Sequence, residues 1–228
     1  MNTSHDSVST VRDYAPAITA EKYARATTTG AYAPAITAEK YACATTTGYS
    51  SHATTTGDDA HAPTTGYSSR ATTAGDYACA TTAGYSSSAT TTGDYAHAAT
   101  TGDYAHAATT GQQAHATAAS DFAHATTTGD YAHATTTGRL TYAATTGDYA
   151  HAATTGRVSN ASVSGENAIA VAVGANSRAR AANGGFIVLA QYDEDTVVAV
   201  KTAQVGRDGI KPDTWYRLDA TGEFVEAK

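Results

Sequence analysis

The sequence has little of what a conventional hydrophobic core requires. Its 228 residues include three phenylalanines, one methionine and one tryptophan, although large apolar side chains normally dominate a globular interior. It also contains no apolar run near the roughly eighteen residues that a transmembrane helix needs. The composition therefore predicts neither one large core nor insertion into a membrane.

Cysteine is almost absent, and no targeting segment is visible. Cys43 and Cys79 are too few for a disulfide framework. The N-terminal segment MNTSHDSVSTV lacks the basic and then apolar regions of a secretory signal. We therefore expect a cytoplasmic or virion-associated protein.

Basic residues are in the minority. The chain has 14 lysines and arginines against 21 acidic residues, a net charge of −7, and no basic patch, which argues against ordinary binding to a phosphate backbone. It also lacks a nucleophile elbow, a phosphate loop and paired catalytic carboxylates. These absences predict a protein that is not an enzyme and needs no cofactor.

What the sequence does have is a nonapeptide, GDYAHAATT, which occurs twice in succession from Gly93. The same nine-residue register runs without an insertion from Arg12 to Ala182, giving nineteen units. Such strict periodicity is typical of stacked repeat proteins. It opposes the alternative interpretation of the chain as a disordered low-complexity tract.

Numbering each unit from its glycine shows which positions face inward. Position six is alanine in all nineteen units, position four is alanine, serine or threonine, and position five varies from Pro16 to Arg25 and His52. Alternation along a strand then places positions four and six inside and position five outside. Position one, a glycine in fifteen units, is expected to make a turn with positive φ.

Nine residues are too few for one turn of a solenoid, whereas two units make an eighteen-residue coil of two strands and two turns. The segment GYSS begins at Gly48, Gly66 and Gly84, eighteen residues apart. We therefore predict an all-β fold, a narrow, two-sided β-solenoid (β-roll) of nonapeptide repeats. Two units make each coil, and the coils rise about 4.8 Å each.

The predicted organisation has three parts. Residues 1–11 form an N-terminal lead-in, residues 12–183 form the solenoid, and residues 184–228 form a small C-terminal β cap that closes the stack. In the cap we expect strands at residues 186–192, 196–205, 214–218 and 223–225. Trp215 is expected to anchor the core of this cap.

Two resemblances bear on this prediction. The segment GENAIAVAVGANSRARA, residues 165–181, resembles the head repeats of trimeric autotransporter adhesins, which implies a narrow β-roll and adhesion. Residues 12–228 as a whole, with ATTTG and AATTG cores and a C-terminal DTWYRL and GEFVE, are similar to uncharacterised repeat proteins of gut bacteria and phages. That second resemblance implies no activity.

An eighteen-residue period stacks outward residues into columns. On one face, position five places one above another Arg25, Cys43, His61, Cys79, His97, His115, His133, His151 and Ile169. Solvated histidines are the first interpretation. The alternative is a zinc or copper site at Cys43, His61, Cys79 and His97, but these side chains point in parallel, whereas a tetrahedral site needs ligands that converge.

Acidic and aromatic residues form further columns. Position two on the same side stacks Asp58, Asp76, Asp94, Gln112, Asp130, Asp148 and Glu166. Aspartate after glycine is expected to cap its own turn, and the alternative is a line of carboxylates that imitates nucleic acid. Tyrosines, mostly at position three, are expected to pack on one another, with binding of sugars or proteins as the alternative.

These columns lead to two main hypotheses for function. The first is a rigid structural or interaction protein that presents repeated side chains to a protein or surface partner, or to itself in an oligomer or filament. The second is an adhesin or receptor-binding module that binds glycans through Tyr95, Tyr131 and the histidine column. Less favoured are an acidic nucleic-acid mimic and an ice-binding protein, which would use the threonines at positions seven and nine.

Overall fold

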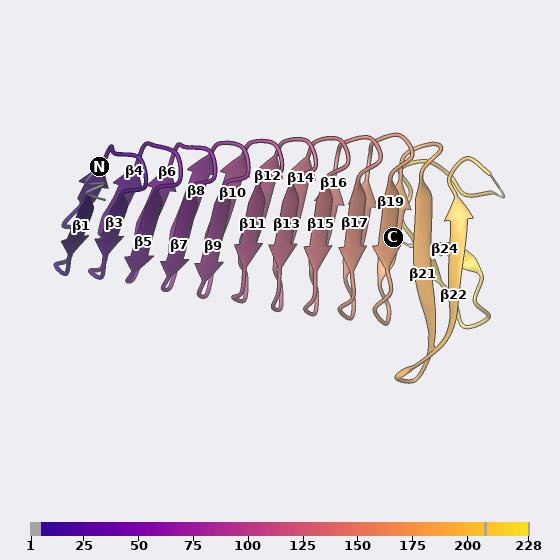
Figure 1. Ribbon diagram of the computed structural model, residues 1–228. Coiled ribbons are helices and arrows are strands. Elements are labelled where there is room, and N and C mark those ends of the chain that lie inside the picture. The colour runs from indigo at the N-terminus through magenta and orange to yellow at the C-terminus, as the bar shows by residue number, and fades with distance from the viewer. Residues whose placement is uncertain (1–5, 208, 228) are drawn as a thin grey trace.

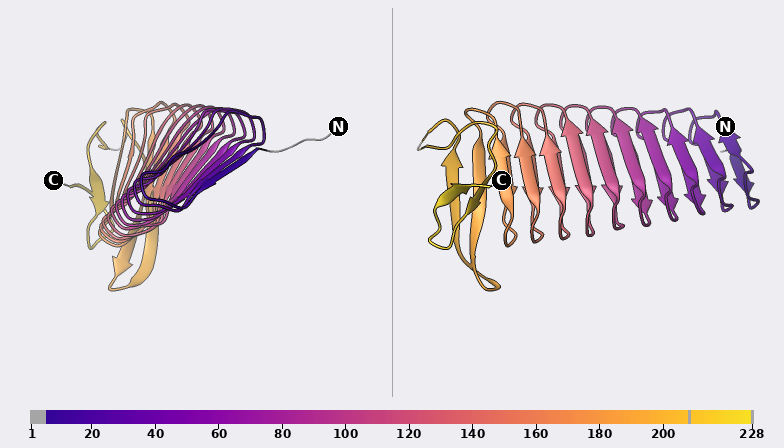
Figure 2. Two further views of the ribbon diagram at one scale, coloured as in Figure 1. Left: turned by 90° about the vertical axis from the view of Figure 1, so that its left-hand side faces the viewer. Right: turned by 180° about the vertical axis from the view of Figure 1, so that it is seen from behind.

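The structure, a computed structural model, describes residues 6–207 and 209–227, and none of these residues is helical. Their strands form two twelve-stranded sheets that run the length of one axis (Figure 1). Viewed along that axis, the coils lie over one another in a narrow, flattened outline (Figure 2). The predicted two-sided β-solenoid is confirmed.

The strands alternate between the two sheets. Sheet A consists of β1 (Ser7–Thr10), β3 (Arg25–Thr28), β5 (Cys43–Thr47), β7 (His61–Thr65), β9 (Cys79–Ala83), β11 (His97–Thr100), β13 (His115–Ala118), β15 (His133–Thr136), β17 (His151–Thr154), β19 (Ile169–Ala172), β21 (Phe186–Asp193) and β22 (Thr196–Gln204). Sheet B consists of β2 (Ala17–Thr19), β4 (Pro34–Thr37), β6 (His52–Thr55), β8 (Arg70–Ala74), β10 (Ser88–Thr92), β12 (His106–Thr110), β14 (His124–Thr128), β16 (Tyr142–Thr145), β18 (Asn160–Val163), β20 (Arg178–Ala181), β23 (Tyr216–Leu218) and β24 (Phe224–Glu226).

Successive coils pair in parallel with an eighteen-residue register. His97 of β11 lies opposite His115 of β13, for example. The backbone N–H of His115 donates to the carbonyl of Ala96 at 2.9 Å. The ladder of hydrogen bonds between coils therefore starts at the first residue of the strand. Every residue therefore has the residue eighteen positions away as its neighbour, at about one strand spacing of 4.8 Å.

The stack includes a strand within the predicted N-terminal lead-in. β1 pairs in parallel with β3, and Val8 lies opposite the inward Ala26. Residues 7–10 therefore occupy the positions of one more repeat unit, which contributes its strand to sheet A. Residues 1–5 of the predicted lead-in lie outside the described residues.

The interior is thin because small side chains fill it. The side chains at positions four and six are buried, as predicted, with Ala107 1% exposed; the exception is the half-buried Ala15 of the first unit. Position eight also faces inward and is mostly threonine. Thr28 Oγ1 donates to the carbonyl of Ala33 at 3.1 Å, but in the described chain thirteen position-eight threonines have a buried hydroxyl with no hydrogen-bond partner. An unpaired buried hydroxyl costs about 1–3 kcal/mol, so the backbone ladder and the packed methyl groups must hold the coils together.

The turns differ from the prediction. All nineteen position-three residues have φ between 52° and 65°, among them Tyr95, Phe122 and Val158. Only five of the glycines at position one have positive φ, between 152° and 159°, so the prediction that position one carries the left-handed conformation was wrong. That conformation costs an L-residue roughly 1–2 kcal/mol. In the seventeen units from Tyr14 to Val158 it also directs the position-three N–H at the next coil, as Tyr77 N–H donates to the carbonyl of Asp94 at 2.9 Å.

Glycine is favoured at position one, where Arg12, Glu21, Glu39 and Ser120 are the exceptions, chiefly because the coils approach one another there. A Cβ added to Gly102 would lie 2.0 Å from the carbonyl oxygen of Gly84 in the preceding coil. No side chain fits at that distance without a shift of the backbone. The glycine column therefore sets how closely the turns stack.

The C-terminal cap continues both sheets and then ends them. β21 pairs in parallel with β19, and its Ile187 and Leu189 occupy inward positions that alanines hold in the preceding coil. β22 then folds back antiparallel on β21. On the other side β23 pairs antiparallel with β20, with Tyr216 opposite Ala179.

Trp215 is not the anchor of the cap, contrary to the sequence prediction. Its ring is only partly buried, and the guanidinium carbons of Arg180 and Arg178 lie 4.8 Å and 5.2 Å from the ring centroid. The neighbouring Tyr216 is the buried residue, at 3% exposure. Alternation along β23 therefore directs Tyr216 inward and leaves Trp215 outside, where the arginines cover it.

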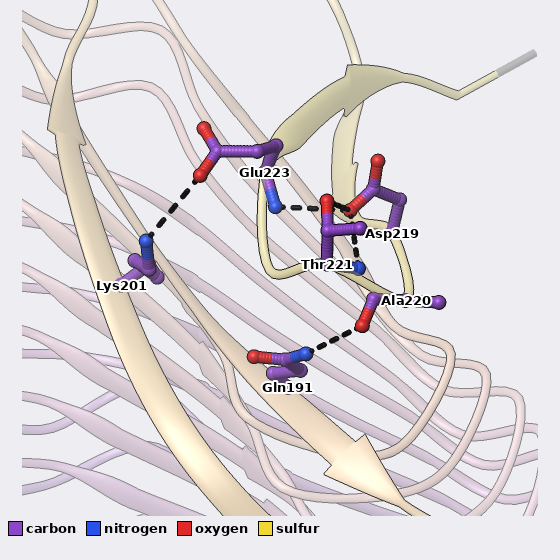
Figure 3. Close-up of polar contacts among 6 residues, drawn as sticks. All are labelled: Gln191, Lys201, Asp219, Ala220, Thr221 and Glu223. Carbon is purple, nitrogen blue, oxygen red and sulfur yellow. Dashed lines mark hydrogen bonds and ion pairs between the residues drawn. The ribbon is translucent and has the colours of Figure 1, made fainter.

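A cluster of polar contacts joins the β23–β24 hairpin to the long hairpin formed by β21 and β22 (Figure 3). The Asp219 carboxylate accepts hydrogen bonds from Thr221 N–H at 2.9 Å, Thr221 Oγ1 at 2.7 Å and Glu223 N–H at 3.0 Å. Gln191 Nε2 of β21 donates to the Ala220 carbonyl at 2.9 Å. Residues 219–223 therefore both form the tight turn between β23 and β24 and attach that turn to β21.

None of the described residues forms a helix of the length and apolarity that crossing a membrane requires.

The interior makes a direct prediction about size. Ala107→Leu should destabilise the fold by about 3 kcal/mol because the two sheets leave no room for the added atoms. His106→Leu, at the outward neighbouring position, should change stability by about 1 kcal/mol or less. Thermal unfolding of both variants measures the difference, and equal losses in melting temperature would contradict the inward and outward assignment.

The left-handed turns make a second prediction. Val158 is β-branched and has φ 57°, a conformation that such residues strongly disfavour. Val158→Asn should therefore raise the stability by about 1 kcal/mol, or roughly 2–4 °C in melting temperature, since Asn167 and Asn176 already occupy this position with φ of 53° and 57°. Val198→Asn, at an exposed position of strand β22, is the control and should give no gain.

Candidate functional site

The outward side chains gather into columns, and the two edges of the solenoid carry different chemistry. We call one the aromatic edge, formed by the turns that lead into sheet B, and the other the acidic edge, formed by the turns that lead into sheet A. The aromatic edge contains Tyr14, Tyr32, Tyr49, Tyr67, Tyr85, Tyr104 and Phe122. The acidic edge contains Asp58, Asp76, Asp94, Gln112, Asp130, Asp148 and Glu166, together with tyrosines at position three.

The seven rings of the aromatic edge form one uninterrupted column. Neighbouring ring centroids lie 4.7–5.6 Å apart, and four of the six contacts are stacked within 11° of parallel. The side chains remain between 38% and 71% exposed. The faces of the rings are therefore largely occupied by one another, while their outer edges and hydroxyl groups face solvent.

Two different backbone positions supply these rings. Tyr49, Tyr67 and Tyr85 stand at position two of their units, whereas the other four rings stand at position three. The two contacts that depart from parallel, at 65° for Tyr32–Tyr49 and 53° for Tyr85–Tyr104, fall where the carrying position changes. Sequence reasoning expected tyrosines, mostly at position three, to pack on one another, but it missed that all seven rings share one column.

The acidic edge has tyrosine pairs rather than a continuous column. Tyr95 stacks on Tyr77 at 4.9 Å, and Tyr131 stacks on Tyr149 at 5.2 Å. Gln113 stands between Tyr95 and Tyr131 in the register, so these two predicted binding residues lie two coils apart, about 9.6 Å. The expectation that tyrosines pack on one another across coils is confirmed.

The aspartates of the acidic edge connect one coil to the next. Asp94 N–H donates to Asp76 Oδ1 at 2.9 Å, and Gln112 N–H donates to Asp94 Oδ1 at 2.8 Å. The prediction that each aspartate caps its own turn was therefore wrong, since the carboxylate caps the turn eighteen residues later. Near the N-terminal end, an ion pair with Lys40 at 2.5 Å lowers the pKa of Asp58.

The predicted histidine column is present on sheet A. Ring centroids are 4.9 Å apart for His97–His115, 4.8 Å for His115–His133 and 5.0 Å for His133–His151. Burial lowers the pKa of His115 and His133, and the neighbouring imidazoles lower it further. These two imidazoles therefore resist protonation as long as the coils stay stacked.

The candidate metal ligands also lie in register but do not converge. Cys43, His61, Cys79 and His97 follow one another across β5, β7, β9 and β11, and both cysteines are free. Burial raises the pKa of the Cys79 thiol, which disfavours the thiolate that a metal needs. Within residues 6–207 and 209–227, no group of three or more His, Cys, Asp or Glu side chains is placed to hold a metal ion.

A shallow depression lies where the aromatic edge reaches the cap. It is lined by Leu140 and Val158, which continue the position-three column, and by Asn160, Arg178 and Arg217. Glu226 lines it as well, so apolar, basic and acidic groups meet here, unlike on the rest of the edge. Arg178 donates to Asn160 Oδ1 at 2.7 Å, so part of this lining is already engaged in holding sheet B.

No protein-family model matches this chain, and neither a curated protein nor a solved structure matches it.

The histidine column predicts a pH dependence of stability. The folded pKa values of His115 and His133 lie below the ordinary value, so the unfolded chain binds more protons as the pH falls below about 6.5. The free energy of unfolding should therefore be highest above about pH 6.5. It should decrease as the pH falls further, until the two histidines are protonated in the folded state as well. Melting temperatures measured between pH 7.5 and pH 5, where most carboxylates stay ionised, should show this loss.

A matched variant identifies the groups responsible. Replacing His115 and His133 with asparagine, a residue that Asn160 already provides at position five, should reduce the dependence on pH while the fold is retained. Part of the dependence should remain, because burial also lowers the pKa of His52 and His124. An unchanged slope in this variant would show that other groups cause the loss.

Proposed function

We propose that this protein is a non-enzymatic structural and interaction protein, a rigid β-solenoid that binds a protein or surface partner through its exposed columns. The observation that carries the proposal is the aromatic edge, where seven rings in a row remain exposed. Contiguous apolar surface of this kind on a soluble protein marks an interaction site more often than chance exposure does.

The repetition itself favours binding over catalysis. Each column offers many copies of one chemical group at a fixed spacing of about 4.8 Å, whereas a catalytic site needs unlike groups that converge on one atom. Many equivalent weak contacts on a stiff support add up to strong attachment because each later contact is intramolecular. The coils supply the stiffness, since every one is hydrogen-bonded to its neighbours at both strands and turns.

One observation favours glycan binding as a second candidate function. On the acidic edge, Gln113 interrupts the rings, so no ring stacks on the sides of Tyr95 and Tyr131 that lie toward it. The face of an aromatic ring carries partial negative charge and attracts the C–H groups of a sugar. The resemblance of residues 165–181 to adhesin head repeats supports the same candidate.

Capture experiments distinguish the two functions. The immobilised protein is exposed to host lysate and to a glycan array, and bound proteins are cross-linked and mapped by mass spectrometry. Binding to a protein should give cross-links at eighteen-residue intervals along one edge. It should be lost when Tyr49, Tyr67 and Tyr85 are together replaced with serine.

Sugar binding that disappears in Tyr95→Asn with Tyr131→Asn would instead favour the glycan module. Cross-links confined to the C-terminal end, near Arg178 and Arg217, would contradict both candidate functions, because each places binding on a column of the solenoid.

A further inference from the structure

We propose that the partner of the aromatic edge is a second copy of this chain, and that two solenoids pair side by side with their aromatic edges in contact. The inference rests on the proposed function, because it names the partner of the same surface. Three properties of the edge support it: the area of exposed ring, the absence of charge along its central part, and the period of the column.

The exposed area is that of a stable dimer. A fully exposed aromatic side chain presents about 200 Å², so seven side chains that are 38–71% exposed leave roughly 650 Å² of aromatic surface on one copy. Two such surfaces in contact bury about 1,300 Å², within the range of specific protein interfaces.

Charge separates this edge from the opposite one. From Ala31 to Ser86, positions two and three of four successive aromatic-edge turns carry no charged residue; they hold Ala31 with Tyr32, Tyr49 with Ser50, Tyr67 with Ser68, and Tyr85 with Ser86. The acidic edge holds Asp58, Asp76 and Asp94 over the corresponding coils. Because the chain has a net charge of −7, two copies repel each other, and the uncharged stretch is where they can approach at least cost.

The period of the column selects the partner. Since the ring faces stack on one another, the surface offered outward consists of ring edges and hydroxyl groups that repeat every 4.7–5.6 Å. A second copy has the same period over the same length, so its outward ring edges and hydroxyl groups can meet these groups at every coil. A sugar chain or an ordinary protein surface would match only a few of these groups. A sugar would also find few free ring faces on which to stack, because neighbouring rings already cover them.

Contact between the same surface on two copies closes at a dimer. An edge that meets itself is related by a two-fold axis, and such an interface is self-complementary and leaves no free copy of the surface. The column of seven rings centres on Tyr67, which also lies within the uncharged turns, so a two-fold axis that crosses the stack near Tyr67 sets the seven rings of one copy against the seven of the other. The two solenoids then lie antiparallel, with their caps at opposite ends.

Sedimentation equilibrium of the full chain tests the inference. From micromolar concentrations to about 0.2 mM, the mass should rise from the 23.2 kDa of one chain to twice that value. Replacing Tyr49, Tyr67 and Tyr85 together with serine should weaken dimerisation by about tenfold or more, since central aromatic residues dominate interface energies. These three stand at position two, so the left-handed position-three residue is not altered.

Two further variants keep the test decisive. Tyr67→Arg puts a charge next to the two-fold axis and should also abolish the dimer, and the fold accepts it because Arg139 and Arg157 already occupy this position on the same edge. Tyr77→Asn, Tyr95→Asn and Tyr131→Asn together remove three rings from the acidic edge and should leave the dimer unchanged. Circular dichroism establishes that each variant keeps its β structure.

A wild-type mass of one chain throughout the range, or equal weakening by the acidic-edge variant, would overturn the inference. The proposed function is tested separately. A chain that stays monomeric but loses a captured protein when the aromatic edge is altered would refute the dimer and support the function. A monomer that captures nothing would refute both.

Discussion

The hydrogen-bond ladder between coils is the constraint on which the rest of this structure depends. Parallel strands pair at one spacing of about 4.8 Å, and an eighteen-residue coil brings each residue over its own counterpart. The small interior side chains, the glycine at the closest approach of the turns and the left-handed position three all serve that pairing. A residue such as Val158, whose φ of 57° would be unfavourable in an isolated turn, keeps this conformation because the neighbouring coils form hydrogen bonds with the backbone of its turn.

The same constraint determines where function can reside. A column multiplies one kind of contact and cannot assemble a diverse site, so differences between the two edges decide what each can bind. The aromatic edge is continuous and uncharged over its central turns, while the acidic edge alternates pairs of rings with polar residues. Carboxylates connect coils at both edges, as Asp76 does on the acidic edge and Asp103 on the aromatic edge. The cap stops both sheets at one end with antiparallel strands, where Ile187 and Leu189 replace alanine in the interior.

Much of this architecture could be predicted from the sequence because period and burial are visible in it. The invariant alanine at position six established the inward face, and the recurrence of GYSS at eighteen residues established the coil. The conformation of position three could not be predicted, since Tyr95 and Leu140 are poor candidates for positive φ and only the hydrogen bonds to the next coil explain it. Likewise, nothing in the order of residues shows that Tyr49 and Tyr32, seventeen apart, share a column, or that Arg180 covers Trp215 outside the core.

Hydrogen exchange at single-residue resolution tests the central claim most directly, because exchange rates report which backbone amides are protected by stable hydrogen bonds. The account predicts slow exchange that repeats with the nine-residue unit from β3 to β20, including the position-three amides of the turns, which bond to the next coil. Fast exchange throughout the ATTTG segments, as expected of a disordered low-complexity chain, would contradict it.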